Sequence, residues 1–533
     1  MPSAARTTIV KPGDPNLRSA VHLALAFAAV KLALHIVGTL YAQHLGYSYF
    51  RDEFYYLMCG RRLAWGYVDH GPLVAIQARL TTLLFGTSVL GIRLLSHLAG
   101  AAAVSLTGIL AWSLGGDRSA QSLAMLGLLV APEYIALDSF LSMNSFEPVF
   151  WMLCTLALIR ILSGSSPGKW WTIVGISAGL GLLNKPSMTF FLVALGIGLL
   201  LTPERRILFT RWSALGIALL TLIALPNVLW QIHQNWPTLE FLHNGQLQHK
   251  NISLPLPSFL WAQIKEMHPL NALLWITGLV SLLRARSIPR MRWIALTYLA
   301  FFLITFALHA KDYYLVPIYP VLFAAGAIAW QHRFAPNPPR RDRIFASPGL
   351  ETALILSGLV ILPMTLPILR PGTWITYTSA LHLHSPPTEN AKSGPLPQFF
   401  ADRFGWQEEV DLVNRAFQTL SPEDRARVTI YADNYGEAGA IDILGARHHL
   451  GLPPVVCPHN TYWLWGPGNR SLDLVIAISG GTPTELHEEY SSVTLIGHMD
   501  NPLAMPFEHK HVYLLRHRHP EATFDWKKKK RYI

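Results

Sequence analysis

The amino-acid sequence predicts a mainly α-helical protein that crosses a membrane many times and carries a C-terminal α/β domain outside it. Of the 533 residues, 51% are hydrophobic and only 14% are charged, whereas charged residues make up roughly 25% of ordinary soluble domains. Apolar stretches close to the ~18 residues that span a hydrocarbon core recur as far as residue 370. Beyond that point they shorten, and proline, glycine and charged residues become more frequent. A helical bundle in lipid, followed by a separate domain, is therefore expected.

The N-terminal elements set the expected orientation. Residues 1–19 form a polar, basic tail that is expected on the cytoplasmic side. The apolar run at about 20–42 lacks a small-residue cleavage site, so it is expected to remain as a membrane helix rather than be removed as a signal peptide. Residues 43–92 are then expected to form an outer loop. Its short apolar stretch at about 72–86 contains a glutamine and an arginine and is predicted to lie along the outer membrane surface.

Ten further spans are expected after this loop, which gives residues 20–370 about eleven transmembrane helices. Loops assigned to the inside carry most of the basic residues, including Arg118, Arg205 and Arg206, and short loops assigned to the outside carry far fewer. This asymmetry supports the orientation. The ten segments lie at about 93–115, 120–136, 148–163, 170–183, 187–202, 212–231, 269–284, 292–308, 313–330 and 350–369.

Two classes of partner are excluded by the placement of charge and by the motifs. The formal net charge of +11 could suggest a nucleic acid, but the basic residues are spread through short loops and no nucleic-acid-reading motif is present. The segment NYGEAGA, at 434–440, has the glycines of a tight turn entering a helix. It lacks the GxGxxG and GxxxxGKS/T patterns of nucleotide sites. The sequence therefore predicts neither a nucleic-acid partner nor a nucleotide cofactor.

The C-terminal part predicts a linker and one small domain. Residues 371–394 contain the proline-rich, polar tract SPPTENAKSGPLPQ, which is typical of a linker. Residues 395–533 are enough for one domain. RVTIYA, DLVIAIS, SVTLIGH and HVYLLRH are expected to be strands, and 401–420 and 435–444 are expected to be helical. These elements predict an α/β unit outside the membrane.

Charged residues are sparse in this chain, yet they cluster in the stretch 47–73, YSYFRDEFYYLMCGRRLAWGYVDHGPL. Asp52 and Glu53 lie beside Arg51, and a second acidic residue, Asp69, precedes a histidine. Ionisable groups at a membrane edge are costly unless they pair, hydrate or take part in chemistry. We interpret this stretch as the reaction centre. Either Asp52 or Glu53 would accept the proton of an attacking hydroxyl, while its neighbour binds a cation or orients the loop.

A phosphate that leaves such a centre needs positive charge where negative charge develops. Arg51, Lys185 and Lys311 are the basic candidates assigned to the outer face. For the two lysines the alternative is structural, because lysine side chains at helix ends extend along the helix to reach the membrane surface.

A divalent cation is a further expectation. Carboxylates suit Mg²⁺ or Mn²⁺, and added imidazole would suit Mn²⁺ or zinc. No fixed spacing joins the candidates, so the pattern leaves open whether they bind a metal or are polar residues at helix ends. They are Asp69, His70, Glu147, His268 and His309.

The sequence contains, in this order, RDEFYY, YVDHGPL, SMNSFEPVFW, GLLNKPSM, PNVLWQIHQNWPTLEF and HAKDYYLVPIYP. This ordered set, over about residues 20–335, resembles the family 39 glycosyltransferases. These GT-C membrane enzymes include the dolichyl-phosphate-mannose protein mannosyltransferases and the bacterial aminoarabinose lipid A transferase. FADRFGW, NYGEAGAIDILG and YWLWGP resemble the appended domain of a bacterial subgroup. The resemblance implies a GT-C fold in the bacterial inner membrane, with the active site and the C-terminal domain on the extracytoplasmic side.

The resemblance also implies residue roles. The catalytic base falls on Asp52, with Glu53 as its neighbour. The second acidic residue of the loop falls on Asp69. The lysine after the fifth helix and the later KxxYxxP pattern would hold the lipid phosphate. Together with Arg51 and His70, which the charge cluster itself indicates, the residues expected to bind substrate are Arg51, Asp69, His70, Lys185, Lys311 and Tyr314.

The residues expected to bind a metal are Asp69, Glu147 and His309. Glu147 matches the acidic residue that usually follows the third helix, but the family has Asp there. Asp138 and Asn144 are the alternative matches. This departure leaves the metal, whether Mg²⁺, Mn²⁺ or Zn²⁺, open.

The activity implied is transfer of a sugar from a polyprenyl-phosphate carrier to a hydroxyl on a glycan, lipid or protein acceptor. A single in-line displacement with a base on the acceptor predicts inversion at the anomeric carbon. One alternative is a transporter or flippase of lipid-linked sugar, which should carry ionisable groups in the middle of its helices. Another is a non-catalytic scaffold for envelope assembly, in which Asp52 and Glu53 would be dispensable. The sugar, the acceptor and the oligomeric state do not follow from the sequence.

Overall fold

The computed structural model divides into two compact units. Unit 1 comprises Met1–Leu40, Arg93–Leu229 and Ser253–Ile368, and unit 2 comprises Tyr41–Ile92, Trp230–Ile252 and Leu369–Ile533. Most of the predicted N-terminal tail and part of the predicted linker lie outside the described residues. The described residues are 17–533 except 249, 251, 285–287, 289, 335–339, 384–389 and 391.

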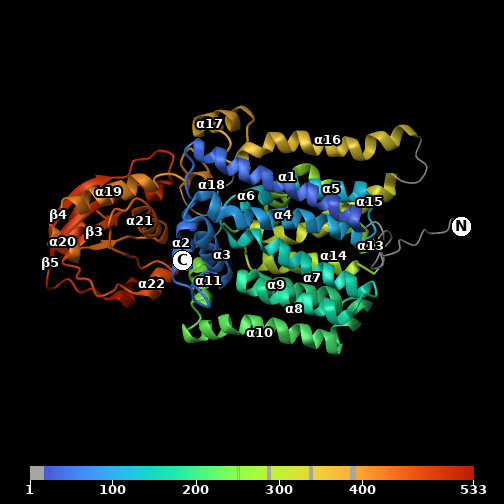
Figure 1. Ribbon diagram of the computed structural model, residues 1–533, viewed down its shortest axis with the longest axis horizontal. Coiled ribbons are helices and arrows are strands. Elements are labelled where there is room, and N and C mark those ends of the chain that lie inside the picture. The colour runs from blue at the N-terminus through green and yellow to red at the C-terminus, as the bar shows by residue number, and fades with distance from the viewer. Residues whose placement is uncertain are drawn as a thin grey trace. The chain divides into compact units, whose positions relative to one another are not determined.

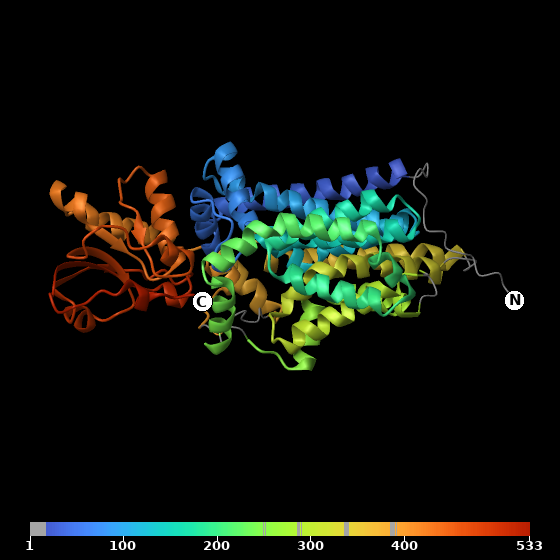
Figure 2. The same cartoon turned by 90° about the horizontal axis from the view of Figure 1, so that it is seen from below.

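Unit 1 is a bundle of helices that run side by side (Figures 1 and 2). Short 3-10 turns, η1 (Met143–Ser145), η2 (Pro203–Leu208), η3 (Pro269–Asn271) and η4 (Asp312–Ile318), connect some of them. The ends of α1, α4 and α10 extend into unit 2. The helices are α1 (Leu17–His44), α4 (Val89–Ser113), α5 (Arg118–Val130), α6 (Pro132–Leu137), α7 (Glu147–Leu162), α8 (Pro167–Asn184), α9 (Ser187–Leu200), α10 (Arg211–His233), α12 (Leu256–Glu266), α13 (Ala272–Arg284), α14 (Arg292–Ala307), α15 (Tyr319–Phe334) and α16 (Arg340–Thr365).

Each of the eleven spans expected from the sequence overlaps a helix of this bundle, although the span at 120–136 is divided between α5 and α6 and the span at 313–330 begins in η4. Six segments in the described part of the chain are long and apolar enough to cross a membrane, and four apolar helices are shorter. One of the shorter ones is α3 (Pro72–Phe85), which was predicted to lie along the membrane surface. The mainly helical fold is therefore confirmed, and the number of spans stays a prediction.

Small residues allow the closest contacts in the bundle. A Cβ atom at Gly278 of α13 would lie 2.2 Å from the carbonyl oxygen of Leu322 in α15. A Cβ atom at Gly326 of α15 would lie 2.0 Å from the carbonyl oxygen of Leu274 in α13. Glycine at both positions lets the two backbones touch, which is how helices associate in lipid, where burying apolar surface supplies no driving force.

Unit 2 combines three helices from the first half of the chain with the C-terminal α/β part. The first three are α2 (Arg51–Arg61), α3 and α11 (Pro237–Leu247). The segment predicted as an outer loop therefore folds together with the predicted C-terminal domain. The C-terminal helices and turns are α17 (Pro371–Ala380), α18 (Gln398–Ala401), α19 (Trp406–Gln418), α20 (Pro422–Arg427), α21 (Tyr435–Arg447), α22 (Thr461–Trp465), α23 (Pro483–His487), η5 (Pro506–Glu508) and η6 (Trp526–Lys529).

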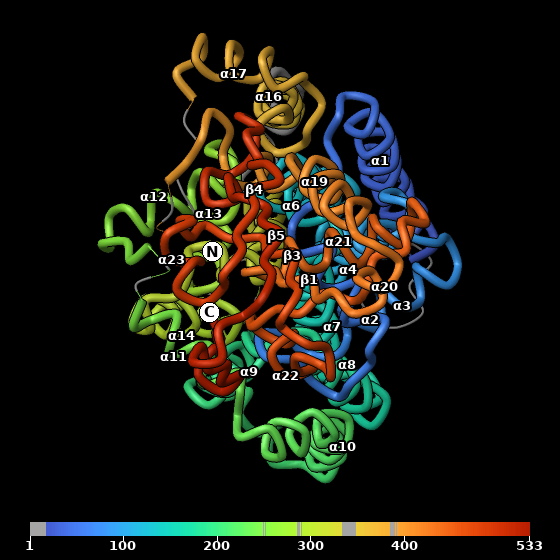
Figure 3. The backbone as a smooth tube through the Cα atoms, turned by 90° about the vertical axis from the view of Figure 1, so that its left-hand side faces the viewer, coloured from blue at the N-terminus to red at the C-terminus, as the bar shows by residue number. Residues whose placement is uncertain are grey.

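A five-stranded mixed sheet forms the centre of the α/β part (Figure 3). The strand order is β2-β1-β3-β5-β4. The first three strands in this order run parallel, and β5 pairs antiparallel with both β3 and β4. One row of the core runs from Ile430 through Ile476 to Leu514. The strands are β1 (Thr429–Tyr431), β2 (Val455–Val456), β3 (Leu474–Ser479), β4 (Tyr490–His498) and β5 (His511–Arg518).

The predictions for this part are confirmed for four strands and for α19 and α21. The sequence analysis missed β2, because a two-residue strand shows no alternation. The prediction of a linker at 371–394 is wrong for its first ten residues, which form α17. Pro371 is the first residue of that helix, where its missing N–H costs nothing. Trp374 then packs against Phe400 in a core cluster, which anchors the helix.

Candidate active site

The two adjacent carboxylates at the start of α2 have different environments. Glu53 is fully buried, and its Oε2 accepts a hydrogen bond from the Phe50 N–H at 2.8 Å. This bond closes the first turn of the helix. Asp52 is only partly buried on the same turn, where the helix dipole favours negative charge. Asp52 is therefore the member of the pair that a substrate can reach.

Tyr435, the first residue of α21, contacts Asp52 directly. Its hydroxyl donates a hydrogen bond to Asp52 Oδ1 at 2.8 Å. Burial raises the pKa of Tyr435 well above its ordinary value, and the nearby Asp52 charge raises it further. The phenol therefore stays protonated at neutral pH and acts as the donor.

Arg51 lies between an acidic group and aromatic rings. Its Nε is 3.5 Å from Glu508 Oε1. Its guanidinium carbon lies 4.9 Å from the centre of the Tyr435 ring and 5.1 Å from that of Phe507. Carboxylate pairing and ring contacts both stabilise a guanidinium that is largely removed from water.

The glycines of NYGEAGA serve packing. A Cβ atom at Gly439 would lie 2.8 Å from Phe54 Cβ and 3.0 Å from the Phe54 carbonyl carbon, so glycine lets α21 approach α2 closely. The Asn434 side chain accepts hydrogen bonds from the N–H groups of Gly436 and Glu437 and so caps α21. This segment is therefore a capped, close-packed helix start beside Asp52.

The second acidic residue of the loop is tied to the C-terminal part. Tyr55 donates a hydrogen bond to Asp69 Oδ1 at 2.7 Å, and its hydroxyl lies 2.5 Å from Thr461 Oγ1. The Val68 N–H donates to the same Thr461 oxygen at 3.1 Å. These bonds fix the YVDHGPL segment against α22.

His70 is buried and neutral. Its Nδ1 lies 2.7 Å from the Gly71 carbonyl oxygen, so Nδ1 carries the hydrogen. Its ring stacks on Tyr67 at 4.6 Å, and burial lowers the pKa of His70. Its Nε2 has no hydrogen-bond partner among the described residues. A neutral imidazole in this state offers Nε2 as an acceptor or ligand atom.

In unit 1, Lys185 is the centre of a second polar cluster. Its ammonium donates to Asn144 Oδ1 at 2.8 Å and to Glu147 Oε2 at 3.0 Å. The same group lies 4.4 Å from the centre of the Tyr314 ring. Ser187 donates to the other oxygen of Glu147. The structure thus brings two predicted phosphate-binding residues, Lys185 and Tyr314, together, and Glu147 is the counter-ion of the lysine.

The other predicted residues of unit 1 have separate surroundings. Lys311 precedes η4, and its carbonyl oxygen accepts a hydrogen bond from the Tyr314 N–H. His309 is exposed, with Nδ1 2.9 Å from Ser253 Oγ. Asp138, an alternative match for the metal residue, pairs with Lys31 at 3.0 Å, and both are buried.

Each residue named for a metal contacts other side chains, and metal binding stays a prediction. Glu147 is used by Lys185 and Ser187, His309 contacts Ser253, and Asp69 accepts from Tyr55. Across the described part of the chain, no group of three or more His, Cys, Asp or Glu side chains is arranged to hold a metal ion. We therefore derive no step that involves a metal.

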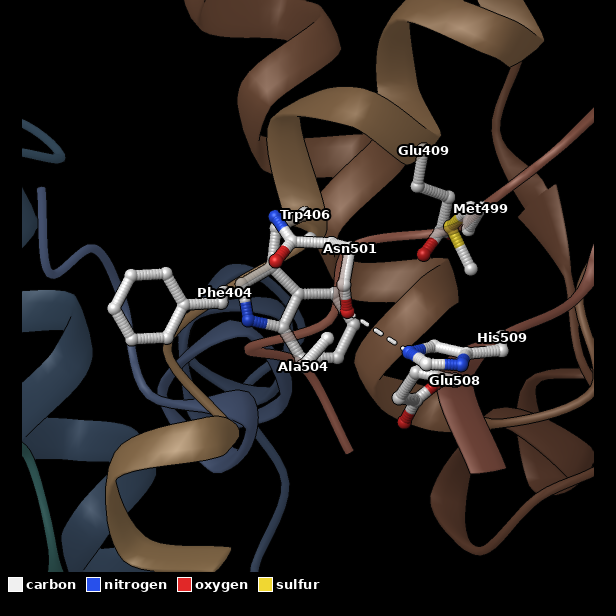
Figure 4. A pocket seen from close by; sticks show the side chains of 9 residues that line it. Phe404, Trp406, Glu409, Met499, Asn501, Ala504, Glu508 and His509 are labelled. Carbon is white, nitrogen blue, oxygen red and sulfur yellow. Dashed lines mark hydrogen bonds between the residues drawn. The ribbon is translucent and has the colours of Figure 1, made fainter. Parts of the chain in front are cut away.

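Two cavities differ in character. In unit 2, a cavity of about 10 Å³ is bordered by Trp406, Glu409, Glu508 and His509 (Figure 4). Both carboxylate oxygens of the buried Glu409 lack a hydrogen-bond partner among the described residues. In unit 1, an apolar cavity of about 390 Å³ lies among α8, α9 and α10.

Sequence analysis missed the C-terminal residues that contact the loop, which are Tyr435, Thr461 and Glu508. They lie 383 or more residues along the chain from their partners, and no motif spacing connects them. The signal that could have revealed them is the pair of glycines in NYGEAGA, because glycine inside a helix indicates close packing.

Comparison with known proteins bears on these sites. Residues 69–230 match the family described as dolichyl-phosphate-mannose-protein mannosyltransferase. The lipid A galacturonosyltransferase RgtD of Rhizobium johnstonii is 26% identical over 253 residues, which are 46% of this chain and 51% of that protein. The match to this curated relative thus spans about half of its length.

Solved structures share the fold. ArnT from Cupriavidus metallidurans bound to undecaprenyl phosphate has a TM-score of 0.58 and 16% identity, covering 92% of this chain and 97% of that one. The apo state of the same protein has a TM-score of 0.58 and covers 93% and 98%. These findings support the resemblance drawn from the motifs: residues 69–230 match the mannosyltransferase family, and the chain as a whole has an ArnT-like membrane fold.

Proposed function

We propose that this protein transfers a sugar from a polyprenyl-phosphate carrier to a hydroxyl of a lipid or glycan acceptor on the extracytoplasmic side of a bacterial inner membrane. The observation that carries the proposal is the state of Asp52, a partly exposed carboxylate held by Tyr435 beside Arg51. A carboxylate in hydrogen-bond reach of an acceptor hydroxyl can act as general base, which is typically worth roughly 10²- to 10⁴-fold.

The relatives support the carrier and the acceptor class. A protein of the same fold binds undecaprenyl phosphate, and the curated relative is a lipid A galacturonosyltransferase. The apolar cavity among α8, α9 and α10 has the lining that an isoprenoid or acyl chain would need. A lipid carrier and a lipid A-like glycolipid acceptor are therefore the substrates that we propose.

Lys185 would stabilise the leaving phosphate. An ammonium has three N–H donors, and Asn144 and Glu147 use two of them. The third would donate to a phosphate oxygen as negative charge develops there. In a single displacement, the acceptor oxygen bonds to the anomeric carbon as the bond from that carbon to phosphate breaks. Asp52 takes the hydroxyl proton, and the configuration at the anomeric carbon inverts.

The test is sugar transfer in membranes of an expressing strain, with radiolabelled polyprenyl-phosphate sugars that include a hexuronic acid. With wild type we expect the label to appear in the lipid extract. Asp52→Asn should transfer it at least about 100-fold more slowly. Glu423→Gln, an exposed change on α20, is the control and should keep the rate. Each variant's abundance is measured by immunoblot.

Two outcomes contradict the proposal. If wild type transfers label but Asp52→Asn is equally active at equal abundance, Asp52 is not the base. If no carrier donates its sugar while a lipid-linked sugar changes sides of the membrane, the protein is a transporter.

A further inference from the structure

We propose that Tyr435 is a positioning residue for the Asp52 carboxylate, so that the C-terminal α/β part completes the reaction centre. This inference rests on the proposed role of Asp52 as the base. Nothing in the order of the motifs predicts it, because Tyr435 lies 383 residues further along the chain than Asp52.

The contact itself is direct and well formed. The Tyr435 hydroxyl donates to Asp52 Oδ1 at 2.8 Å, the usual distance of an O–H···O hydrogen bond. Such a bond fixes the rotation of the carboxylate. It also stabilises the ionised form, which a general base needs in order to accept a proton.

The tyrosine ring is held from several sides. It stacks on Tyr55 with ring centres 4.7 Å apart and planes at 26°, and it lies 4.7 Å from the ring of His459. The Arg51 guanidinium covers it at 4.9 Å. Tyr435 is 9% exposed, so its hydroxyl has little freedom to leave Asp52.

The backbone beneath Tyr435 is equally fixed. Asn434 caps α21 with its side chain, and Glu437 Oε2 accepts the Asn434 N–H at 3.1 Å. A Cβ atom at Gly436 would lie 2.7 Å from Arg51 Cγ. A larger residue there would displace the Arg51 side chain from its place beside the start of α21, so this glycine allows the contact between Arg51 and Tyr435.

A second residue joins the same assembly. Glu508, on η5, pairs with Arg51 at 3.5 Å and also accepts from the Asn434 amide at 3.2 Å. Arg51, next to Asp52, and Asn434, next to Tyr435, thus both contact the Glu508 carboxylate. This shared contact couples the start of α2 to the start of α21.

The test compares Tyr435→Phe with Tyr513→Phe in the transfer assay. Tyr435→Phe keeps the ring and removes only the hydroxyl. Tyr513→Phe removes a hydroxyl on β5 that donates to the carbonyl oxygen of Gly481, beyond the end of β3, and it is the matched control. We expect Tyr435→Phe to lower kcat about tenfold, with KM for the carrier within about twofold of wild type.

The pH profile separates a positioning role from a structural one. Loss of a hydrogen bond to the ionised carboxylate raises the pKa of the base, so the acidic limb of kcat should move up by about one pH unit in Tyr435→Phe. The position of this limb does not depend on how much enzyme is folded. The double variant with Asp52→Asn should be no slower than Asp52→Asn alone, because both changes act through one carboxylate.

The outcomes of the inference and of the proposed function are distinguishable. If wild type is active and Asp52→Asn is not, but Tyr435→Phe has the kcat and acidic limb of wild type, the positioning role is overturned and the proposed function stands. A lower kcat with an unmoved limb also overturns it, since that result marks loss of folded protein. An inactive wild type would instead overturn the proposed function.

Discussion

Lys185 and Glu147 form an ion pair in which each charge depends on the other. Both side chains are nearly buried, and their atoms are 3.0 Å apart. A buried charge without its partner is costly, typically by about 3–5 kcal/mol. Loss of activity in a Lys185 variant would therefore not by itself show that Lys185 binds phosphate.

A double variant resolves the ambiguity. We expect Lys185→Met to reduce both abundance and transfer, because it leaves the Glu147 carboxylate buried and unpaired. Adding Glu147→Gln removes that charge and should restore abundance without restoring transfer. Immunoblots and the transfer assay measure the two effects separately. Recovery of transfer in the double variant would mean that Lys185 has only a structural role.

Glu409 provides a prediction about pH. Burial raises the pKa of Glu409 well above its usual value, and the neighbouring Glu437 and Glu508 carboxyls raise it further. Burial likewise raises the pKa of Glu437 to about 8. The folded protein therefore holds protons that the unfolded chain releases near pH 4.5. The contribution of these two groups to the free energy of unfolding should be largest below that pH and fall as the pH rises toward 8.

Glu409→Gln replaces one titrating carboxyl group with a neutral amide of the same size. We expect the variant and wild type to unfold at similar temperatures at pH 5. At pH 8 the variant should unfold at a higher temperature than wild type, because it has no buried carboxyl that must give up a proton. Tryptophan fluorescence of the full chain in detergent measures this, with the exposed Glu423→Gln as control. A variant that follows wild type at both pH values would show that Glu409 is ionised in the folded state.

At the scale of elements, the contact between α2 and α21 depends on glycine. A methyl group at Gly439 would collide with the backbone of Phe54, which cannot move without moving α2. At Gly445, on the same helix, a methyl group would meet only the Leu452 Cδ1 at 3.1 Å, the far end of a flexible side chain. Replacing either glycine by alanine changes the helix propensity in the same way, but only the change at Gly439 disturbs the packing of α21 against α2.

We expect Gly439→Ala to destabilise the protein by about 1–3 kcal/mol and to reduce transfer, because it shifts α21 and with it Tyr435. Gly445→Ala should be neutral or stabilising, since alanine favours a helix over glycine by up to about 1 kcal/mol. Thermal unfolding and the transfer assay on both variants provide the comparison. Equal behaviour of the two would show that the α2–α21 contact does not require glycine.

At the scale of the whole molecule, the sequence predicted the elements better than their grouping. Apolar length predicted most helices of unit 1, and alternation predicted β1, β3, β4 and β5, because both patterns are local. The sequence analysis placed residues 43–92 with the membrane domain. In the structure they belong to unit 2 with the C-terminal part. No local pattern indicates which distant surface a loop will pack against.

The sequence by itself determined that most of the first 370 residues form apolar helices, that the rest is α/β, and which residue types stand at the proposed reaction centre. Composition and period carry that information, and the order of motifs indicated the family. Only the tertiary structure decided that Asp52 is the accessible carboxylate and Glu53 the buried one, and that Glu147 neutralises Lys185. It also placed Tyr435 against Asp52. These facts depend on contacts between residues far apart in the chain. Burial and backbone packing determine such contacts, and the spacing of residues along the sequence does not reveal them.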